Sequence, residues 1–211
     1  MNVDLVTATG QAPAPFHPAM VAEPVTFELR SARTEEAGQI HALIQDHLEE
    51  GHLLPRGLDE LTVRAGRFVV AVAGDRVVAC AELAPLSGRV AEVRSLVVHD
   101  DARHEGLGKL LVHELMRRAR LDGFDTLCAF THGPGFFVRL GFSIVPHQWV
   151  PEKIAHDCVG CSQFRHCGQY AVSLPLRAGA GLRLEQTAPP ARSVAPPRAS
   201  VERLRLVPIP A

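Results

Sequence analysis

One stretch constrains the fold of this chain more than any other: it runs from Ala91 to Arg118 and reads AEVRSLVVHDDARHEGLGKLLVHELMRR. Its first part is rich in β-branched residues and predicts a strand, while leucines recur at helical spacing from Leu107 onward. Between the two lies a turn that contains Gly106 and Gly108. Glycines let backbone N–H groups approach a ligand closely, and the unpaired N–H groups at a helix start carry a partial positive charge. The pattern predicts an anion-binding turn suited to a pyrophosphate, with an ordinary strand–turn–helix connection as the alternative.

A resemblance to a known family rests on two motifs. The first is the turn Arg103-His104-Glu105-Gly106-Leu107-Gly108-Lys109, which resembles the acetyl-coenzyme A signature of the GNAT acetyltransferase superfamily. The second is Phe136-Phe137-Val138-Arg139-Leu140-Gly141-Phe142, which is similar to a later helix-and-strand motif of that superfamily. The resemblance covers about residues 25–176. It implies an α/β (α+β) fold, the GNAT fold: a mixed, mostly antiparallel sheet with a central splayed strand pair flanked by helices.

Hydrophobic periodicity predicts the other elements in outline. Thr34 is expected to cap a helix that Gly51 ends. Gly74-Asp75-Arg76 is expected to join two strands in an antiparallel hairpin. Pro175 suggests that the last strand lies at an edge of the sheet or ends there. The expected strands lie near 25–29, 68–73, 77–86, 90–98, 126–130, 142–145 and 170–176, and a short helix lies near 136–140.

Composition narrows the partners and the location. The 211 residues are enough for one domain with a core, and the net charge of −1 gives no electrostatic case for nucleic acid or an anionic membrane. No apolar run reaches the roughly 18 residues that span a bilayer. The first cationic residue is Arg30, which argues against a signal peptide, and five cysteines do not suggest a secreted disulfide scaffold. We expect a cytoplasmic protein with no nucleic-acid or membrane partner; a homodimer stays open.

Both ends of the chain differ from its middle in composition. Residues 1–24 contain prolines and little periodicity, and they are expected to form a disordered leader. Residues 177–211 are rich in proline, alanine and arginine, and they are expected to form a disordered tail. The acetyltransferase domain is therefore expected at 25–176.

The resemblance implies acetyl-CoA as cosubstrate and indicates where it would bind. In GNAT enzymes the pantetheine arm pairs with the central strand, and a strand N–H polarises the acetyl oxygen. Carried over to this chain, that strand is Leu96-Val97-Val98, with Val98 as the expected catalytic donor and Phe137 as a further contact. The diphosphate is expected on the turn residues Arg103, His104, Glu105, Gly106, Leu107, Gly108 and Lys109.

Two charged residues precede that strand and project on the same face, because side chains alternate along a strand. Glu92 is the predicted general base, acting through water, since the α-ammonium of an acceptor must lose a proton before it attacks. Arg94 has a two-pronged guanidinium that can grip a substrate carboxylate. The residues themselves leave a structural Glu92–Arg94 ion pair as the alternative. Their Glu-x-Arg pattern is similar to that of N-acetylglutamate synthases, which favours the substrate role.

The same resemblance assigns two further cations to the substrate. Leu53–Leu61 is similar to the substrate-binding region of short, single-domain N-acetylglutamate synthases and carries Arg56. The other interpretation is a turn with a solvated Arg56. Lys153 lies in a segment similar to the C-terminal part of those enzymes, which makes it a candidate carboxylate binder, with a solvated helix lysine as the alternative. The resemblance implies L-glutamate as the acceptor, whose carboxylates Arg56 and Arg94 could bind.

Phe137 stands where many GNAT enzymes have a tyrosine, and phenylalanine cannot donate a proton. The leaving thiolate must then take its proton from water, from the departing ammonium or from another group. His132 and Cys128 lie near in the sequence, and a solvated histidine is the simpler interpretation of the former.

A cysteine cluster lies further along, at Cys158, Cys161 and Cys167, with His156 and His166 nearby. These residue types suit zinc, but the spacing between the second and third cysteines does not match a standard zinc motif, so no metal is predicted. Buried thiols, or a redox pair or disulfide, are the alternatives.

These observations predict transfer of acetyl from acetyl-CoA to the α-amine of L-glutamate, the first step of arginine biosynthesis, with a small molecule as the substrate. Two alternatives stay open. One is a GNAT enzyme that acetylates another amino acid or a protein N-terminus, and the other is a non-catalytic CoA-binding module.

Overall fold

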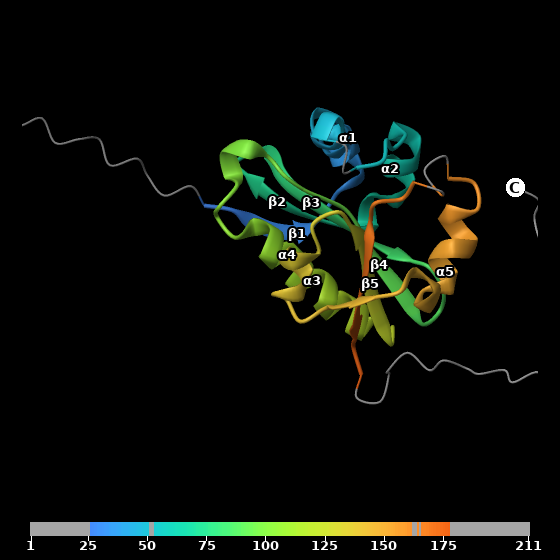
Figure 1. Ribbon diagram of the computed structural model, residues 1–211. Helices are drawn as coiled ribbons and strands as arrows, with labels where there is room; N and C mark the ends of the chain where they lie inside the picture. Colours follow the sequence, from blue (N-terminus) through green and yellow to red (C-terminus); the bar gives the residue numbers. More distant parts are fainter. Residues whose placement is uncertain (1–25, 51–52, 162–163, 165, 178–211) are drawn as a thin grey trace, which may run out of the picture.

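The structure of this chain is a computed structural model, and it describes residues 26–50, 53–161, 164 and 166–177 (Figure 1). The expected leader at 1–24 lies outside these residues, as does the expected tail at 177–211 apart from Arg177. In the described part of the chain, helices lie on both faces of a central sheet (Figure 1).

The sheet has the strand order β1-β2-β3-β4-β5-β7-β6 in the described residues. Neighbouring strands are antiparallel except β4 and β5, which are parallel. This arrangement confirms the expected mixed, mostly antiparallel sheet. The strands are β1 (Glu28–Ser31), β2 (Phe68–Ala73), β3 (Arg76–Pro85), β4 (Val90–Val98), β5 (Thr126–Thr131), β6 (Ser143–Val145) and β7 (Tyr170–Pro175).

The longest described helix is α3, which follows the glycine turn as predicted. None of the described helices is long and apolar enough to cross a membrane. The α-helices are α1 (Ala37–Asp46), α2 (Leu58–Arg64), α3 (Leu107–Leu121), α4 (Pro134–Val138) and α5 (Pro151–Lys153), and a π-helical turn (Ile154–Cys158) continues α5. Short 3₁₀ turns lie at Thr34–Glu36, Leu48–Glu50, Ala65–Arg67, Asp100–Ala102 and His147–Trp149.

Strand β2 illustrates how both faces of the sheet are buried. Its sequence FVVAVA is continuously apolar, which is typical of a strand covered on both sides. Phe68 and Val70 pack in the core on the α1 and α2 side, whereas Val69 and Ala71 pack against α3. This alternation follows from the two-residue period of a strand, and it lets β2 pack against helices on both faces of the sheet.

The start and end of the first helix differ from the prediction. The entry is stabilised by Glu36, whose carboxylate accepts a hydrogen bond from the Arg33 N–H at 2.7 Å, and Thr34 lies inside the first turn. The helix α1 ends at Asp46, before Gly51, which lies outside the described residues. Pro175 is the last residue of β7, which confirms that the strand ends there; β7 is not an edge strand, but its pairing with β6 covers only residues 171–173.

The two parallel central strands, β4 and β5, separate halfway along β4. Its parallel pairing with β5 runs from Val90–Thr126 to Val93–Ala129, and β4 then continues to Val98. On its other side the register with β3 shifts between Glu82–Arg94 and Cys80–Val97. This β-bulge centres on Ser95, whose φ is +47°, and bulges bend the strand that carries them. The expected splayed strand pair is thereby confirmed, and the bulge is its local cause.

Replacing Leu111 by Ala is expected to lower the free energy of unfolding by about 2–5 kcal/mol, because this fully buried α3 residue would leave a cavity. The neighbouring Leu110 is 49% exposed, and Leu110→Ala is expected to change the same quantity by less than about 0.5 kcal/mol. Urea unfolding followed by circular dichroism measures both variants. Equal losses would contradict the orientation of α3.

Candidate active site

A cleft of about 1190 Å³ opens where β4 leaves β5. One wall is β4 from Glu92 to Val98, and the opposite wall is the end of β5 with the loop Thr131–Gly133. The segment Leu53–Arg56 before α2 and parts of the segment around α5 close its sides. The predicted strand residues Leu96, Val97 and Val98 all line it, as does Phe137.

A second hollow of about 280 Å³ lies at the start of α3 and shares Val98, Arg103, Gly108 and Phe136 with the cleft. Six of the seven predicted turn residues line it; Glu105 is exposed and does not. The set that lines it is Arg103, His104, Gly106, Leu107, Gly108 and Lys109, together with Val98, Ala102 and Phe136.

The backbone of this turn explains its glycines. Gly106 is the N-cap of α3 and has a φ of +75°, a left-handed conformation that favours glycine. At Gly108 a Cβ atom would come within 3.6 Å of the Phe136 ring, so the turn runs close to α4. The first N–H groups of a helix have no partner within the helix, and here they border the hollow. The geometry suits an anion such as a phosphate.

The edge of β4 beyond Val93 offers a second kind of contact. Once pairing with β5 ends, the backbone groups on that side of residues 94–98 lie along the cleft without a neighbouring strand from the described residues. An exposed strand edge can bind an extended molecule in the manner of an added strand. The cleft therefore joins an anion-binding turn to a vacant strand edge.

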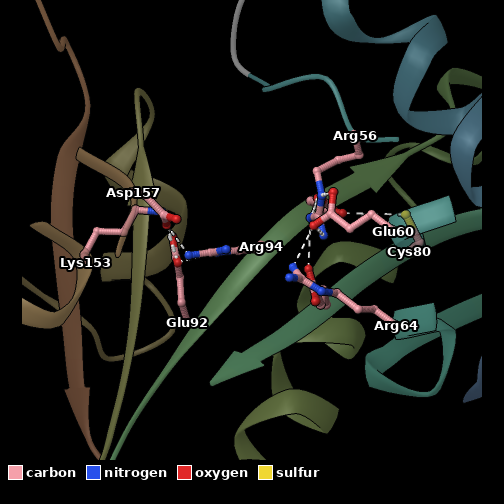
Figure 2. A network of polar contacts seen from close by, with 10 residues as sticks. Arg56, Glu60, Arg64, Cys80, Glu92, Arg94, Lys153 and Asp157 are labelled. Atoms are coloured by element: carbon pink, nitrogen blue, oxygen red, sulfur yellow. Dashed lines mark hydrogen bonds and ion pairs between the residues drawn. The ribbon is translucent and has the colours of Figure 1, made fainter. Parts of the chain in front are cut away.

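Four charged side chains meet at the far end of the cleft, and we call them the quartet: Glu92, Arg94, Lys153 and Asp157 (Figure 2). The Nε of Arg94 donates to Glu92 at 2.5 Å, and an Nη donates to Asp157. Lys153 Nζ lies 2.7 and 3.0 Å from the two oxygens of Glu92 and 2.8 Å from Asp157. It also lies 5.1 Å from the centre of the Phe130 ring.

The contacts within the quartet test the interpretations of Glu92, Arg94 and Lys153 that the sequence left open. The structural Glu92–Arg94 ion pair exists, and Lys153 is 12% exposed instead of solvated. Both oxygens of Glu92 accept hydrogen bonds from cations. Asp157 was not anticipated: its role depends on a π-helical turn that carries no clear sequence signal, and such turns often occur at functional sites.

The charges of the quartet stabilise one another. Burial would raise the pKa of the Asp157 carboxyl, but the hydrogen bond and charge of Lys153, with the charge of Arg94, hold that pKa below its usual range. Burial would lower the pKa of the Arg94 guanidinium, but Glu92 and Asp157 raise it. The Arg94 guanidinium and the Asp157 carboxylate thus favour each other's charged form.

Arg56 belongs to a second cluster beside the quartet (Figure 2). Its Nε and Nη2 donate to the two oxygens of Glu60 at 3.0 and 2.8 Å. Its Nη1 donates to Glu82 at 2.9 Å and to the hydroxyl of Ser95 at 3.0 Å. A guanidinium has five N–H hydrogens, so contacts with described residues leave one for a ligand. Arg56 lines the cleft with a side chain only 10% exposed, so the solvated interpretation is wrong.

This second cluster holds the bulge of β4. Arg56 binds the Ser95 side chain, and the thiol of Cys80 lies 3.6 Å from the Ser95 carbonyl oxygen. Glu82 is fully buried, and burial raises the pKa of the Cys80 thiol to about 12. Sequence analysis missed Glu82 and Ser95. A lone glutamate inside the apolar strand VVACAELA was the available signal, because buried carboxylates require a partner.

Comparison with known proteins adds the family. The model described as "Acetyltransferase (GNAT) domain" matches residues 64–144, which include β4, the glycine turn and α3. This chain contains a GNAT acetyltransferase domain. Its strand order and splayed strands are those of the GNAT fold.

Two curated relatives show how far the similarity to this GNAT domain extends. "Uncharacterized N-acetyltransferase CT2212" of Chlorobaculum tepidum is 29% identical over 144 residues, 68% of this chain and 93% of that protein. An "Amino-acid acetyltransferase" of Shewanella oneidensis is 32% identical over 127 residues, 59% of this chain but 28% of that protein. The chain thus spans less than a third of the amino-acid acetyltransferases that it matches.

Two solved structures share the fold of the domain. The N-acetylglutamate synthase of Neisseria gonorrhoeae, complexed with coenzyme A and N-acetyl-glutamate, superimposes with a TM-score of 0.65 at 23% identity, over 74% of this chain and 37% of that one. Rv2747 of Mycobacterium tuberculosis, in complex with CoA and NLQ, gives a TM-score of 0.61 at 24% identity, over 71% of this chain and 99% of that one.

The structure shows where the side chains considered for protonation of the leaving thiolate lie. Phe137 packs edge-on against Phe136 and Phe142 and has no proton to give. Cys128 is fully buried in the described residues, and burial raises the pKa of its thiol well above the usual value. His132 lines the cleft, with its ring against the backbone of Gly168. It is the named group that is positioned to reach a molecule in the cleft.

The structure tests the buried-thiol interpretation of the cysteine cluster. Cys158 and Cys161 are half-buried, Cys167 is exposed, and all three are free thiols, so the buried-thiol interpretation is wrong for them. In the described residues no three metal-ligating side chains come together. Cys161 N–H donates to the Cys158 carbonyl at 3.1 Å, and this turn ends the segment that presents Asp157.

Replacing Arg56 by Met is expected to lower the free energy of unfolding by about 3–5 kcal/mol, because Glu82 would be left charged and buried without its cation. The matched control is Arg64→Met. Arg64 is 36% exposed and pairs with Glu60 at the surface, so its loss is expected to cost at most about 1 kcal/mol.

Urea unfolding measures both arginine variants, and Arg56→Met combined with Glu82→Met is expected to recover part of the stability, because it removes the stranded carboxylate. An Arg56→Met variant as stable as the parent would show that Arg56 and Glu82 do not form a buried pair.

Proposed function

We propose that this GNAT domain transfers the acetyl group of acetyl-CoA to the α-amine of L-glutamate. The observation that carries the proposal is the cleft itself: an anion-binding turn at one end, a vacant strand edge along β4, and two cations at the other end. Relatives named amino-acid acetyltransferases support an amino acid as acceptor. The complex of the Neisseria synthase with coenzyme A and N-acetyl-glutamate supports both ligands.

The cosubstrate fits the cleft in two places. The N–H groups at the start of α3, with Lys109 beside them, suit the diphosphate of CoA, because they combine unpaired donors with the positive end of the helix. The open edge of β4 at Leu96–Val98 suits the amides of the pantetheine arm. The thioester would then lie along the edge of β4, at the middle of the cleft.

Acetyl transfer there is a substitution at the thioester carbon. The neutral amine attacks the carbonyl carbon, a new C–N bond forms, and the C–S bond breaks. The carbonyl oxygen becomes negative in between, and we assign its stabilisation to a backbone N–H of the β4 edge, at Val98. Loss of one such donor typically costs about 10²–10³ in rate. The thiolate leaves with the electron pair of the C–S bond.

Two proton transfers complete the reaction. The acceptor ammonium loses one proton before attack, and Glu92, which lines the cleft, is our candidate base, acting through water. The thiolate gains one proton. Phe137 cannot supply it, which leaves water, the proton lost by the nitrogen, or His132 on the cleft wall.

The test of this function is thiol release from acetyl-CoA, measured across a panel of amino acids and peptides. Release that depends on glutamate supports the proposal. Release with another amino acid or with a peptide N-terminus would show a GNAT enzyme with a different acceptor. Binding of acetyl-CoA by calorimetry, without release for any amine, would show a non-catalytic module.

Replacing Arg94 by Ala is expected to raise the KM for glutamate by at least about tenfold, or about 1.4 kcal/mol, because a two-pronged carboxylate contact is lost. The KM for acetyl-CoA is expected to stay within about twofold, since that ligand is assigned to the other end of the cleft. Arg89→Ala is the control: Arg89 pairs with Asp125 at the surface, outside the described cleft residues. Normal glutamate kinetics in the Arg94 variant would remove this residue from the acceptor site.

A further inference from the structure

The quartet at the acceptor end of the cleft has no net charge. Arg94 and Lys153 are balanced by Glu92 and Asp157, and three carboxylate oxygens lie within 3.0 Å of Lys153 Nζ. The two cations that would attract an acidic acceptor are therefore already satisfied by protein carboxylates. A further carboxylate that entered without any change would place three anions around two cations, which is unfavourable in a partly buried site.

The two carboxylates of the quartet differ in how firmly they are held. Glu92 lies in the middle of β4, between β3 and β5, and its side chain is 3% exposed. Asp157 lies on the π-helical turn that faces β4 across the cleft, and its side chain is 35% exposed (Figure 2). Because Asp157 borders both water and the cleft, it is the carboxylate that can leave.

We propose that Asp157 is a built-in stand-in for the carboxylate of the acceptor. In the free protein its carboxylate binds Arg94 and Lys153. A carboxylate of the acceptor takes its place, and Asp157 turns to solvent. The exchange keeps two anions on two cations, so it satisfies the buried charges before and after binding. This inference rests on the proposed function only in taking an acceptor that carries a carboxylate besides its amine.

The stand-in gives the site selectivity as well as stability. An acceptor with a neutral group at this position would displace Asp157 from Arg94 and Lys153 without supplying a negative charge. The two cations would then be balanced by one carboxylate only. Competition from the Asp157 carboxylate therefore disfavours binding of neutral acceptors, because their complex would leave a cation unpaired. Asp157 is in this sense a specificity-determining residue, and it takes no part in the bond changes.

Glutarate is the probe that isolates this role, because it carries two carboxylates and no amine. Its dissociation constant is measured by calorimetry on the parent chain of 211 residues and on its Asp157→Asn variant. Removal of a competing charged partner is expected to tighten glutarate binding by about tenfold. With acetyl-CoA saturating, the KM for glutamate is expected to fall by a similar factor, while kcat changes by less than about twofold.

Glu152→Gln is the matched control. Glu152 lies on the same helical segment, and its substitution removes the same charge, but it is not among the described residues that line the cleft. Its glutarate dissociation constant is expected to equal that of the parent. A similar gain in both variants would reduce the effect to general electrostatics and overturn the proposal.

Two other results would also overturn it. If Asp157 binds the acceptor ammonium, Asp157→Asn raises the KM for glutamate and leaves glutarate binding unchanged. If Asp157 only anchors its segment, the variant loses thermal stability and binds glutarate more weakly. Because glutarate binding needs no turnover, absence of thiol release with glutamate would count against the proposed function and not against the role of Asp157.

Discussion

The rest of the site depends on the separation of β4 from β5 after Val93. Continued pairing would satisfy the edge of β4 with another strand and fill the space that the cleft occupies. The bulge at Ser95 makes the separation stable, because it inserts one extra residue opposite Ala81 and turns β4 away. A positive φ at a serine is costly, and contacts from Arg56 to its hydroxyl and from Cys80 to its carbonyl oxygen offset that cost.

Buried charge is the second constraint. Glu82 and Glu92 lie on adjacent central strands and are almost fully buried, so each needs cations close by. Glu82 has Arg56, and Glu92 has Arg94 and Lys153. Both clusters draw residues from segments outside the sheet, the loop before α2 and the segment of α5. The charges therefore fasten those segments to the sheet, and the same contacts place cations beside the cleft.

The sequence predicted the elements with a regular period well. The range of β4 and the start of α3 are as expected, since an apolar strand and a glycine turn leave few alternatives. Tertiary pairing escaped prediction. Arg56 was read either as solvated or as a substrate ligand, but its donors are mostly used by Glu60, Glu82 and Ser95. Pattern reasoning cannot find such contacts, because the partners are brought together by register and by a bulge.

The position of the family match along the chain has a consequence for specificity. Residues 64–144 contain β4 and the glycine turn, the parts suited to a diphosphate and an extended arm. The end that we assign to the acceptor also takes Arg56 from before this range, and Lys153 and Asp157 from after it. The matched range thus holds the part of the cleft that we assign to the donor, together with Glu92 and Arg94 of the quartet. The flanking segments complete the acceptor half, so differences in acceptor between such chains should arise there, where a single carboxylate on a π-helical turn can change which molecules enter.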